Sequence, residues 1–218
     1  MAGSGSRLSD LAYARLLEAL FEGRLPAGSF VSQSDLAELV DVSVVPLRDA
    51  LRTLEAEGVL TIHPRAGIQF VKPGLELTRA TFQFRGILES VAVAHFAETA
   101  SDSEIDEIER RHQEMILHLG GENLDPSLNA KLEELEDLLH GSIVGSLNNP
   151  LINTSYRRVR NYVRLIRVNR RLTRRVVLKS LREHIAIIDA CRHRNPTDAI
   201  AALQAHFAAA LLRSLGLN

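Results

Sequence analysis

The stretch DVSVVPLRDALRTLEAEGVL, residues 41–60, constrains the fold of this chain more than any other. It predicts a short helix that begins after Ser43, whose hydroxyl can cap the first turn, and that ends at Gly58. One side of the predicted helix is apolar and consists of Leu47, Ala50, Leu51 and Leu54. The opposite side carries Val44, Val45, Arg48, Asp49 and Arg52. So short a helix is stabilised mainly by burying its apolar side, so it must pack against neighbouring elements.

Those neighbours are predicted on both sides of the helix. A first helix follows Ser9 as its N-cap and ends at Gly23, and Ser32 with Asp35 forms a capping box for a second, short helix. After Gly58, VLTI and IQFV flank the turn HPRAG and predict a two-stranded hairpin. Three helices followed by a hairpin are typical of a winged helix-turn-helix, in which the third helix enters the major groove of DNA.

The rest of the chain is predicted to be helical. One segment runs from Thr78 to Ala100, and Ser101 with Glu104 opens the next. Further helix starts are marked by a capping residue before proline, at Asp125-Pro126, Asn149-Pro150 and Asn195-Pro196. A break lies between Asn169 and Thr173. About six helices without a convincing strand predict an antiparallel bundle, so the fold class is mainly α.

The predicted organisation has four parts: a disordered tail (1–7), a winged helix-turn-helix domain (8–72), a linker (73–77) and a helical effector-binding and dimerisation domain (78–218). The 218 residues carry a net charge of −1 and a single cysteine, and no apolar run reaches the ~20 residues of a membrane span. We therefore expect a cytoplasmic protein without membrane contact. Residues 1–73 contain seven basic and nine acidic residues, which predicts weak non-specific binding to DNA.

Histidines are the informative residues of the second part. Glu136 and His140 are four residues apart and share an apolar helix face, while His184 and His206 lie on apolar stripes of two later helices. Together, one carboxylate and three imidazoles from three inward faces predict a site for a divalent metal, with Zn²⁺ first. Each histidine alone is better explained as a buried residue satisfied by a hydrogen bond, and the chain has no HExxH signature.

The segment LAELVDVSVVPLRDALRTLEAEGVLTIHPRAGIQFV resembles the winged helix-turn-helix of the GntR family of bacterial transcription regulators. The resemblance implies that Ser43, Arg48 and Arg52 contact DNA in the major groove. It also implies that the wing enters the minor groove, at His63, Arg65 and Gly67. Where the family has Arg-Thr, this chain has Val44-Val45, whose side chains cannot donate hydrogen bonds but can pack on thymine methyls. We therefore expect T-rich contacts at the helix tip and a shallow dependence of DNA affinity on salt.

The segments FRGILESVAVAHFAETAS, EDLLHGSIVGSLNNPLI and REHIAIIDACRHRNPTDAIAALQAHF resemble the FCD ligand-binding domain of the FadR subfamily of GntR regulators. The resemblance implies that a metal is bound by Glu136, His140, His184 and His206, with Glu136 standing where the family has Asp. Zn²⁺ is expected, with Ni²⁺ or Mn²⁺ as alternatives. It further implies that Arg85 holds a small carboxylate effector. The alternative for Arg85 is an exposed ion pair with Glu89.

These expectations describe a homodimeric transcription regulator that binds a near-palindromic double-stranded DNA operator and responds to a small organic acid. Two other functions remain open at this point. The first is a metal-dependent hydrolase or lyase that uses the His/Glu cluster. The second is a metal-free dimeric adaptor in which the histidines are structural.

Overall fold

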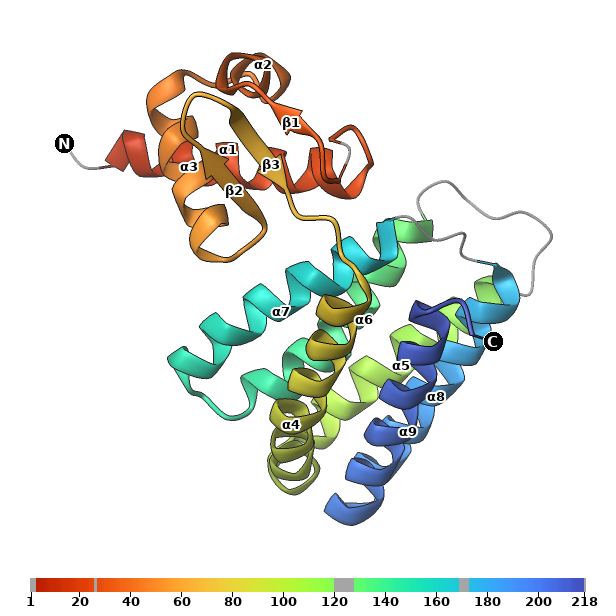
Figure 1. The fold of residues 1–218 in the computed structure, drawn as a ribbon. Coiled ribbons are helices and arrows are strands. Elements are labelled where there is room, and N and C mark those ends of the chain that lie inside the picture. Colours follow the sequence, from red (N-terminus) through yellow and green to blue (C-terminus); the bar gives the residue numbers. More distant parts are fainter. Residues whose placement is uncertain (1–2, 26, 120–127, 169–172, 218) are drawn as a thin grey trace. The chain divides into compact units, whose positions relative to one another are not determined.

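The computed structural model divides the chain into two compact units, each described separately here (Figure 1). It describes residues 3–25, 27–119, 128–168 and 173–217. The described residues of the first unit lie within 1–78 and 157–170, and those of the second within 79–156 and 171–218.

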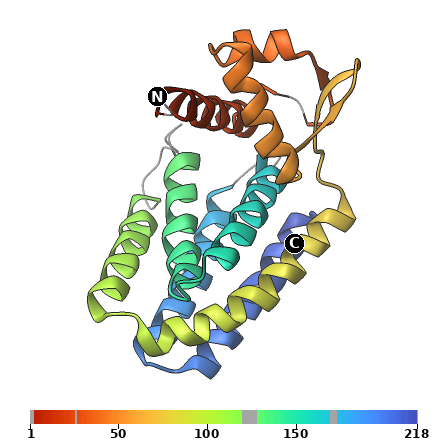
Figure 2. The same cartoon turned by 90° about the vertical axis from the view of Figure 1, so that its left-hand side faces the viewer.

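The first unit contains three helices and a small sheet. Its elements are α1 (Gly3–Phe21), β1 (Phe30–Val31), α2 (Gln33–Leu39), α3 (Val44–Ala56), β2 (Leu60–His63) and β3 (Gly67–Phe70). The strands are antiparallel in the order β1-β3-β2, with Phe30 opposite Gln69 and Ile62 opposite Ile68. The hairpin of β2 and β3 stands out from the helices of its unit (Figure 2). The predicted helix-turn-helix with a wing is therefore confirmed.

Two details of this prediction are wrong. The helix α1 begins at Gly3, so Ser9 is not its N-cap, and residues 3–7 of the predicted tail are helical. Once the buried face of a helix has formed, each further turn adds hydrogen bonds without a new nucleation cost, so the helix extends beyond an internal serine. The wing has three strands instead of two, because Phe30–Val31 pairs with β3. A two-residue strand is too short to show a period of two.

The apolar side of α3 packs on α1, as the helical wheel requires. Leu47 and Leu54 are fully buried, together with Leu16 of α1 and Leu36 of α2. The same core includes Leu60, Ile68 and Phe70 of the sheet. Burying this stripe fixes the rotation of α3 about its axis and leaves the opposite side of the helix toward solvent.

The second unit is built from helices. The six that follow the wing are α4 (Leu75–Thr99), α5 (Asp102–His118), α6 (Leu128–Gly145), α7 (Pro150–Val168), α8 (Arg174–Arg192) and α9 (Pro196–Ser214). The part of α7 from residue 157 onward belongs to the first unit. This number of helices agrees with the prediction. Because α4 begins at Leu75, residues 75–77 of the predicted linker are helical.

Helix starts follow the capping signals in the sequence. The hydroxyl of Ser101 accepts a hydrogen bond from the Glu104 amide at 3.2 Å, and Asn195 accepts one from the Asp198 amide at 3.1 Å. Asn149 likewise accepts from the backbone amide of Leu151. Asp125-Pro126, a further predicted cap, lies outside the described residues. The helices α5, α7 and α9 thus begin where local chemistry indicates.

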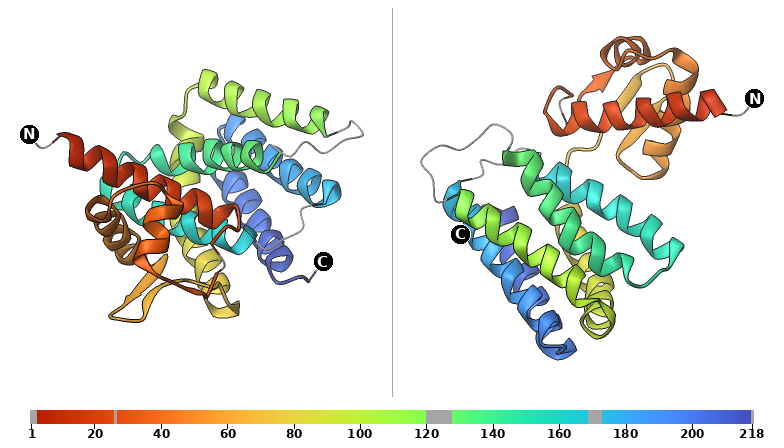
Figure 3. Two further views of the ribbon diagram at one scale, coloured as in Figure 1. Left: turned by 90° about the horizontal axis from the view of Figure 1, so that it is seen from above. Right: turned by 180° about the vertical axis from the view of Figure 1, so that it is seen from behind.

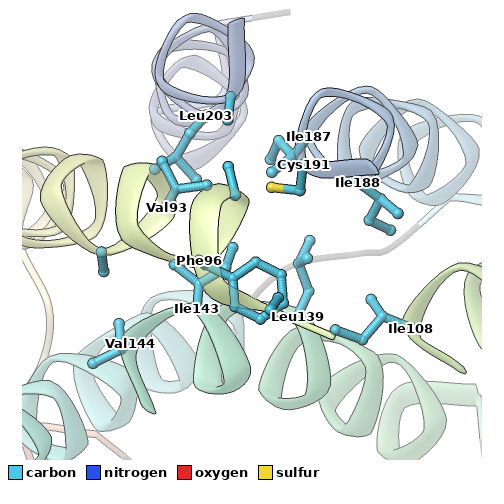
Figure 4. Close-up of a cluster of buried hydrophobic side chains, with 14 of the residues drawn as sticks. Val93, Phe96, Ile108, Leu139, Ile143, Val144, Ile187, Ile188, Cys191 and Leu203 are labelled. Atoms are coloured by element: carbon cyan, nitrogen blue, oxygen red, sulfur yellow. The ribbon is translucent and has the colours of Figure 1, made fainter. Parts of the chain in front are cut away.

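The core of the second unit brings together side chains from α4, α5, α6, α8 and α9, which point toward one another in Figure 4. Phe96, Ile143 and Leu203 lie in this cluster and are at most 2% exposed. The helices α8 and α9 run side by side (Figure 3). In the described part of the chain, no helix combines the length and apolar character needed to cross a membrane.

Candidate functional site

The tip of α3 is apolar and exposed. Ser43 occupies the N-cap position with an extended backbone, but its side chain makes no capping hydrogen bond. Val44 is 42% and Val45 70% exposed, although burial of such side chains is favourable. Arg48 and Arg52 are exposed on the same side, and Arg52 lies 3.9 Å from Asp49. The structure therefore brings all five predicted DNA-contacting residues of this helix to one accessible surface.

The turn before α3 is held by a residue that the sequence did not single out. Arg15 of α1 donates hydrogen bonds to the carbonyl oxygens of Val40 at 2.7 Å and Asp41 at 3.2 Å. Asp41 has a positive φ of 47°, a conformation that Asp adopts more readily than most residues. An arginine on the preceding helix gives no sequence signal of this contact. The contact ties the turn between α2 and α3 to α1.

The three predicted wing residues lie on one hairpin but differ in accessibility. Arg65 is exposed with φ 68°, and Gly67 has φ 114°. A Cβ added at Gly67 would lie 2.8 Å from the carbonyl oxygen of Val31, so glycine is required by conformation and by space. The imidazole of His63 is half-buried, with Nε2 3.2 Å from Oε1 of Gln69 and its ring 5.0 Å from that of Phe30. Of the three predicted residues, Arg65 thus has the most accessible side chain.

In the second unit, the three predicted histidines form one buried cluster. His140 of α6, His184 of α8 and His206 of α9 are each 1% exposed. Each offers one ring nitrogen to a group in which all three nitrogens lie within 4.8 Å of one another. The Nε2 atoms of all three are buried without a hydrogen-bond partner. Buried polar atoms are almost always paired, so three unpaired nitrogens in one buried cluster suit a shared ligand, and the donor set fits a divalent metal.

The other nitrogen of each ring is hydrogen-bonded to a side chain from another helix. Nδ1 of His140 lies 2.7 Å from Oε2 of Glu89, and Nδ1 of His206 lies 2.9 Å from Oε2 of Glu183. The third bond joins Nδ1 of His184 to Nε2 of His112 at 3.2 Å. Such partners fix the rotation and tautomer of a metal-binding imidazole.

These supporting residues were not identified from the sequence. Glu183 adjoins His184 in the chain, and from its helix position it is expected to point elsewhere. It does so, but it reaches His206 and also accepts two hydrogen bonds from Arg213, each of 2.7 Å. Helical spacing shows which residues share a face, but it does not show which face of another helix they meet.

Glu136, the predicted carboxylate ligand, faces two of the three histidines. Its Oε2 lies 3.7 Å from Nε2 of His140, and its Oε1 lies 3.6 Å from Nε2 of His184. These distances exceed a hydrogen bond, and the side chain is 16% exposed. The carboxylate therefore stands at the edge of the cluster on the side of these two rings.

Burial keeps His184 and His206 of the cluster uncharged. Desolvation lowers the pKa of His184 well below its ordinary value and lowers that of His206 to about 4, although Glu183 opposes the second shift. It also lowers the pKa of His112. At neutral pH these imidazoles each carry one proton and one free lone pair, which is the state that a metal requires of its ligands.

Arg85 lies inside the same unit and is only 3% exposed. Its Nε donates to Oε1 of Glu89 at 2.6 Å, and its guanidinium lies 4.4 Å from the ring centroid of Phe207. The predicted alternative, an exposed pair with Glu89, is therefore wrong, since the pair exists but is buried. Although burial opposes it, Arg85 with His140 holds the pKa of Glu89 below its usual value, so the carboxylate is ionised.

One donor of Arg85 is unused. Its Nη1 is buried and has no hydrogen-bond partner, while Glu89 takes up Nε and Nη2. Because the same carboxylate also contacts His140, the unpaired guanidinium nitrogen and the histidine cluster are linked through one side chain. An unsatisfied cationic donor beside a metal-type cluster favours an anionic ligand.

Comparisons with known proteins agree with this arrangement. Residues 8–70 match the gntR family of bacterial regulatory proteins, and residues 80–209 match the FCD domain. The chain is 25% identical over 198 residues to the uncharacterized HTH-type transcriptional regulator YdhC of Bacillus subtilis (strain 168), covering 89% of this chain and 85% of the relative.

Two solved structures have the same fold. McbR/YncC of E. coli superposes with a TM-score of 0.80 at 15% identity, over 96% of this chain and 97% of that one. A GntR-type putative transcriptional regulator of Rhodococcus sp. RHA1 gives a TM-score of 0.77 at 21% identity, over 98% and 99% of the two chains. At these low identities the similarity shows a shared fold and nothing more specific.

Proposed function

Because the chain belongs to the gntR family of bacterial regulatory proteins and carries their FCD domain, we propose that it is a regulator whose histidine cluster holds a divalent metal. A small carboxylate bound at this metal modulates the affinity of the regulator for its DNA operator. Family membership makes the chain a DNA-binding transcription regulator with an effector-binding domain and sets aside the hydrolase or lyase alternative. The observation that carries the proposal is the set of three buried, unpaired Nε2 atoms.

The donor set favours Zn²⁺ as the metal. His140, His184 and His206 supply three imidazole nitrogens, and Glu136 stands beside them as the carboxylate. Three imidazoles with one carboxylate suit Zn²⁺, and Ni²⁺ or Mn²⁺ are alternatives with the same ligand types. When bound, the metal supplies a Lewis-acidic centre for an oxygen ligand.

The effector is a small anion because Arg85 supplies one free donor in a closed environment. Its unpaired Nη1 can donate to a carboxylate oxygen, and the pairing of Arg85 with Glu89 holds the guanidinium in place. Phe207 lies beneath the same guanidinium and adds an apolar wall. A short organic acid, with one oxygen toward the metal and one toward Arg85, meets these requirements.

The operator is bound by α3 and the wing. Val44 and Val45 pack on thymine methyl groups, while Ser43, Arg48 and Arg52 contact phosphates or base edges. His63, Arg65 and Gly67 form the contact of the wing with the minor groove. Since residues 1–73 are slightly acidic overall, the dependence of affinity on salt is shallow.

The regulator acts as a homodimer on a near-palindromic operator in the cytoplasm. Support comes from an apolar stripe on α4, where Phe84, Ile87 and Val91 are 42%, 67% and 65% exposed. Their spacing of three and four residues places them on one face of the helix. An exposed apolar face of this kind suits a two-fold interface, which would present two copies of α3 to two half-sites.

A metal titration combined with an operator selection tests the proposal. Protein purified without a His-tag is stripped with a chelator, titrated with Zn²⁺, and used to select DNA with and without acetate, malate and citrate. We expect one metal per chain, an enriched near-palindromic motif, and an acid whose effect on DNA affinity disappears without metal. A protein that binds no metal but still selects DNA would contradict the metal site and leave a DNA-binding regulator whose histidines are structural.

A further inference from the structure

We propose that His112 is a positioning residue of the histidine cluster, which keeps Nε2 of His184 free of hydrogen and directed at its neighbours. It does so through a short chain of hydrogen bonds that begins at a backbone carbonyl. The inference rests on the proposed metal site and adds to it a residue outside the ligand set. His112 lies on α5, separated in sequence by α6 and α7 from the helix of His184, and is fully buried.

The hydrogen bond to the backbone carbonyl fixes the tautomer of His112. Its Nδ1 lies 2.7 Å from the carbonyl oxygen of Ile108, one helical turn earlier. A carbonyl oxygen can only accept, so the hydrogen is on Nδ1. A neutral imidazole carries one N–H, so Nε2 of His112 is left as an acceptor.

The second bond transfers this restriction to His184. Nε2 of His112 lies 3.2 Å from Nδ1 of His184, and since the first atom accepts, the second must donate. His184 therefore has its hydrogen on Nδ1, and its Nε2 carries a lone pair. That Nε2 is one of the three buried atoms without a hydrogen-bond partner. The edge-to-face packing of the two rings, with centroids 5.3 Å apart, holds the same orientation.

His184 has a neutral hydrogen-bond partner, whereas the other two histidines of the cluster have carboxylates. Glu89 orients His140 and is balanced by Arg85, and Glu183 orients His206 and is balanced by Arg213. A third carboxylate beside His184 would need another buried cation, because an unpaired buried charge is strongly unfavourable. An imidazole fixed by a backbone carbonyl gives the same orientation without adding charge.

The tautomers can be measured directly in the metal-free protein. Long-range ¹H–¹⁵N correlation spectra of the ¹⁵N-labelled full chain distinguish protonated from bare ring nitrogens. We expect both His112 and His184 to carry hydrogen on Nδ1 and to have a bare Nε2. Hydrogen on Nε2 of His184 in the wild-type chain would overturn the proposal, whether or not the protein binds metal.

Variants at residue 112 test the consequence for metal binding. His112→Leu removes the acceptor while filling the space, whereas His112→Gln offers an amide oxygen near the position of Nε2. In competition with a chromophoric chelator, we expect Zn²⁺ affinity to fall by about 10- to 100-fold in His112→Leu and to be largely recovered in His112→Gln. His118→Leu, an exposed change on the same helix, is the matched control and should leave affinity unchanged.

The outcomes separate this proposal from the proposed function. If the wild-type chain binds no Zn²⁺, the metal site is wrong, and the tautomer spectrum alone decides the role of His112. If the wild-type chain binds Zn²⁺ and a folded His112→Leu variant binds it equally well, His112 does not position the cluster. Should His112→Leu fail to fold, the wild-type spectrum and the Gln variant still decide.

Discussion

At the tip of α3, Val44 and Val45 are 42% and 70% exposed, whereas in the second unit His140, His184 and His206 are each 1% exposed. Every ring of the buried cluster is held by a hydrogen bond from another helix, while Ser43 at the exposed tip does not use its hydroxyl even for capping. Side chains at the tip can therefore change with little effect on folding. Side chains at the cluster are tied to their neighbours, so function and stability change together there.

The largest contrast concerns chemical access. Cys191, the only cysteine, is 1% exposed in the core of the second unit, and burial raises the pKa of its thiol to about 12. Because the thiolate is the reactive form, an aromatic disulfide reagent at pH 8 should react with it roughly 1,000-fold more slowly than with an ordinary cysteine. The unfolded chain loses the thiol proton first, so stability should fall as pH rises from about 9 toward 12.

An exposed cysteine on the same chain provides the control. Val45→Cys in a Cys191→Ala background places a thiol at the tip of α3, where the reagent should react at the rate of a free thiol. Both rates follow from absorbance of the released thiolate, with protein in urea as the reference. Equal native rates for the two cysteines would show that the second unit opens readily.

The second contrast compares a buried ion pair with an exposed one. Glu89→Gln removes the charge that balances Arg85, and both residues are at most 3% exposed. An uncompensated buried cation should lower the free energy of unfolding by about 3 kcal/mol, measured by urea denaturation of the metal-free protein. Glu107→Gln removes one of the two carboxylate partners of the exposed Arg110 and should cost at most about 0.5 kcal/mol. Similar losses in the two variants would mean that Glu89 is not needed as a charge.

The third contrast compares a histidine of the cluster with one at the surface. His206→Asn removes a proposed metal ligand, so Zn²⁺ affinity in chelator competition should fall by about 100-fold or more, beyond the loss of an outer partner. His193→Asn, at the exposed end of α8, should leave it unchanged. DNA affinity in the absence of effector should be the same in both variants. An unchanged Zn²⁺ affinity in a folded His206→Asn variant would exclude this residue as a ligand.

The features predicted correctly from the sequence are local ones. Capping at Ser32 and Ser101, the apolar stripe of α3 and the inward position of the three histidines all follow from residues within a few turns of one another. They were sufficient for the order of helices and for the members of the histidine cluster.

The features that were missed join distant parts of the chain. Glu89 lies 51 positions from His140, and His112 lies 72 positions from His184, so no periodicity connects them. The two-residue strand at Phe30 exists only because β3 is beside it. Helical spacing predicts which residues face inward, but the partner that each one meets depends on how the helices pack.

A smaller effect is expected where Val45 contacts DNA. Val45→Ala removes two methyl groups, and at about 0.8 kcal/mol for each buried group the operator affinity should fall roughly tenfold. Stability should not change, because the side chain is 70% exposed. Fluorescence anisotropy with the selected operator measures the affinity, and Leu117→Ala, 76% exposed on α5, is the control. Guanine-specific contacts that disappear in Val45→Ala would contradict the proposed thymine contacts.

The smallest effect separates two serines that both occupy N-cap positions. Ser32 accepts a hydrogen bond from the Asp35 amide at 3.1 Å, whereas Ser43 makes no capping bond. Ser32→Ala should therefore lower the free energy of unfolding by about 1 kcal/mol, and Ser43→Ala should leave it nearly unchanged in the same urea titration. If the Ser43 hydroxyl is free for DNA, Ser43→Ala should still weaken operator binding. A loss of stability equal to that of Ser32→Ala would instead make Ser43 a structural cap and remove it from the DNA-contacting surface.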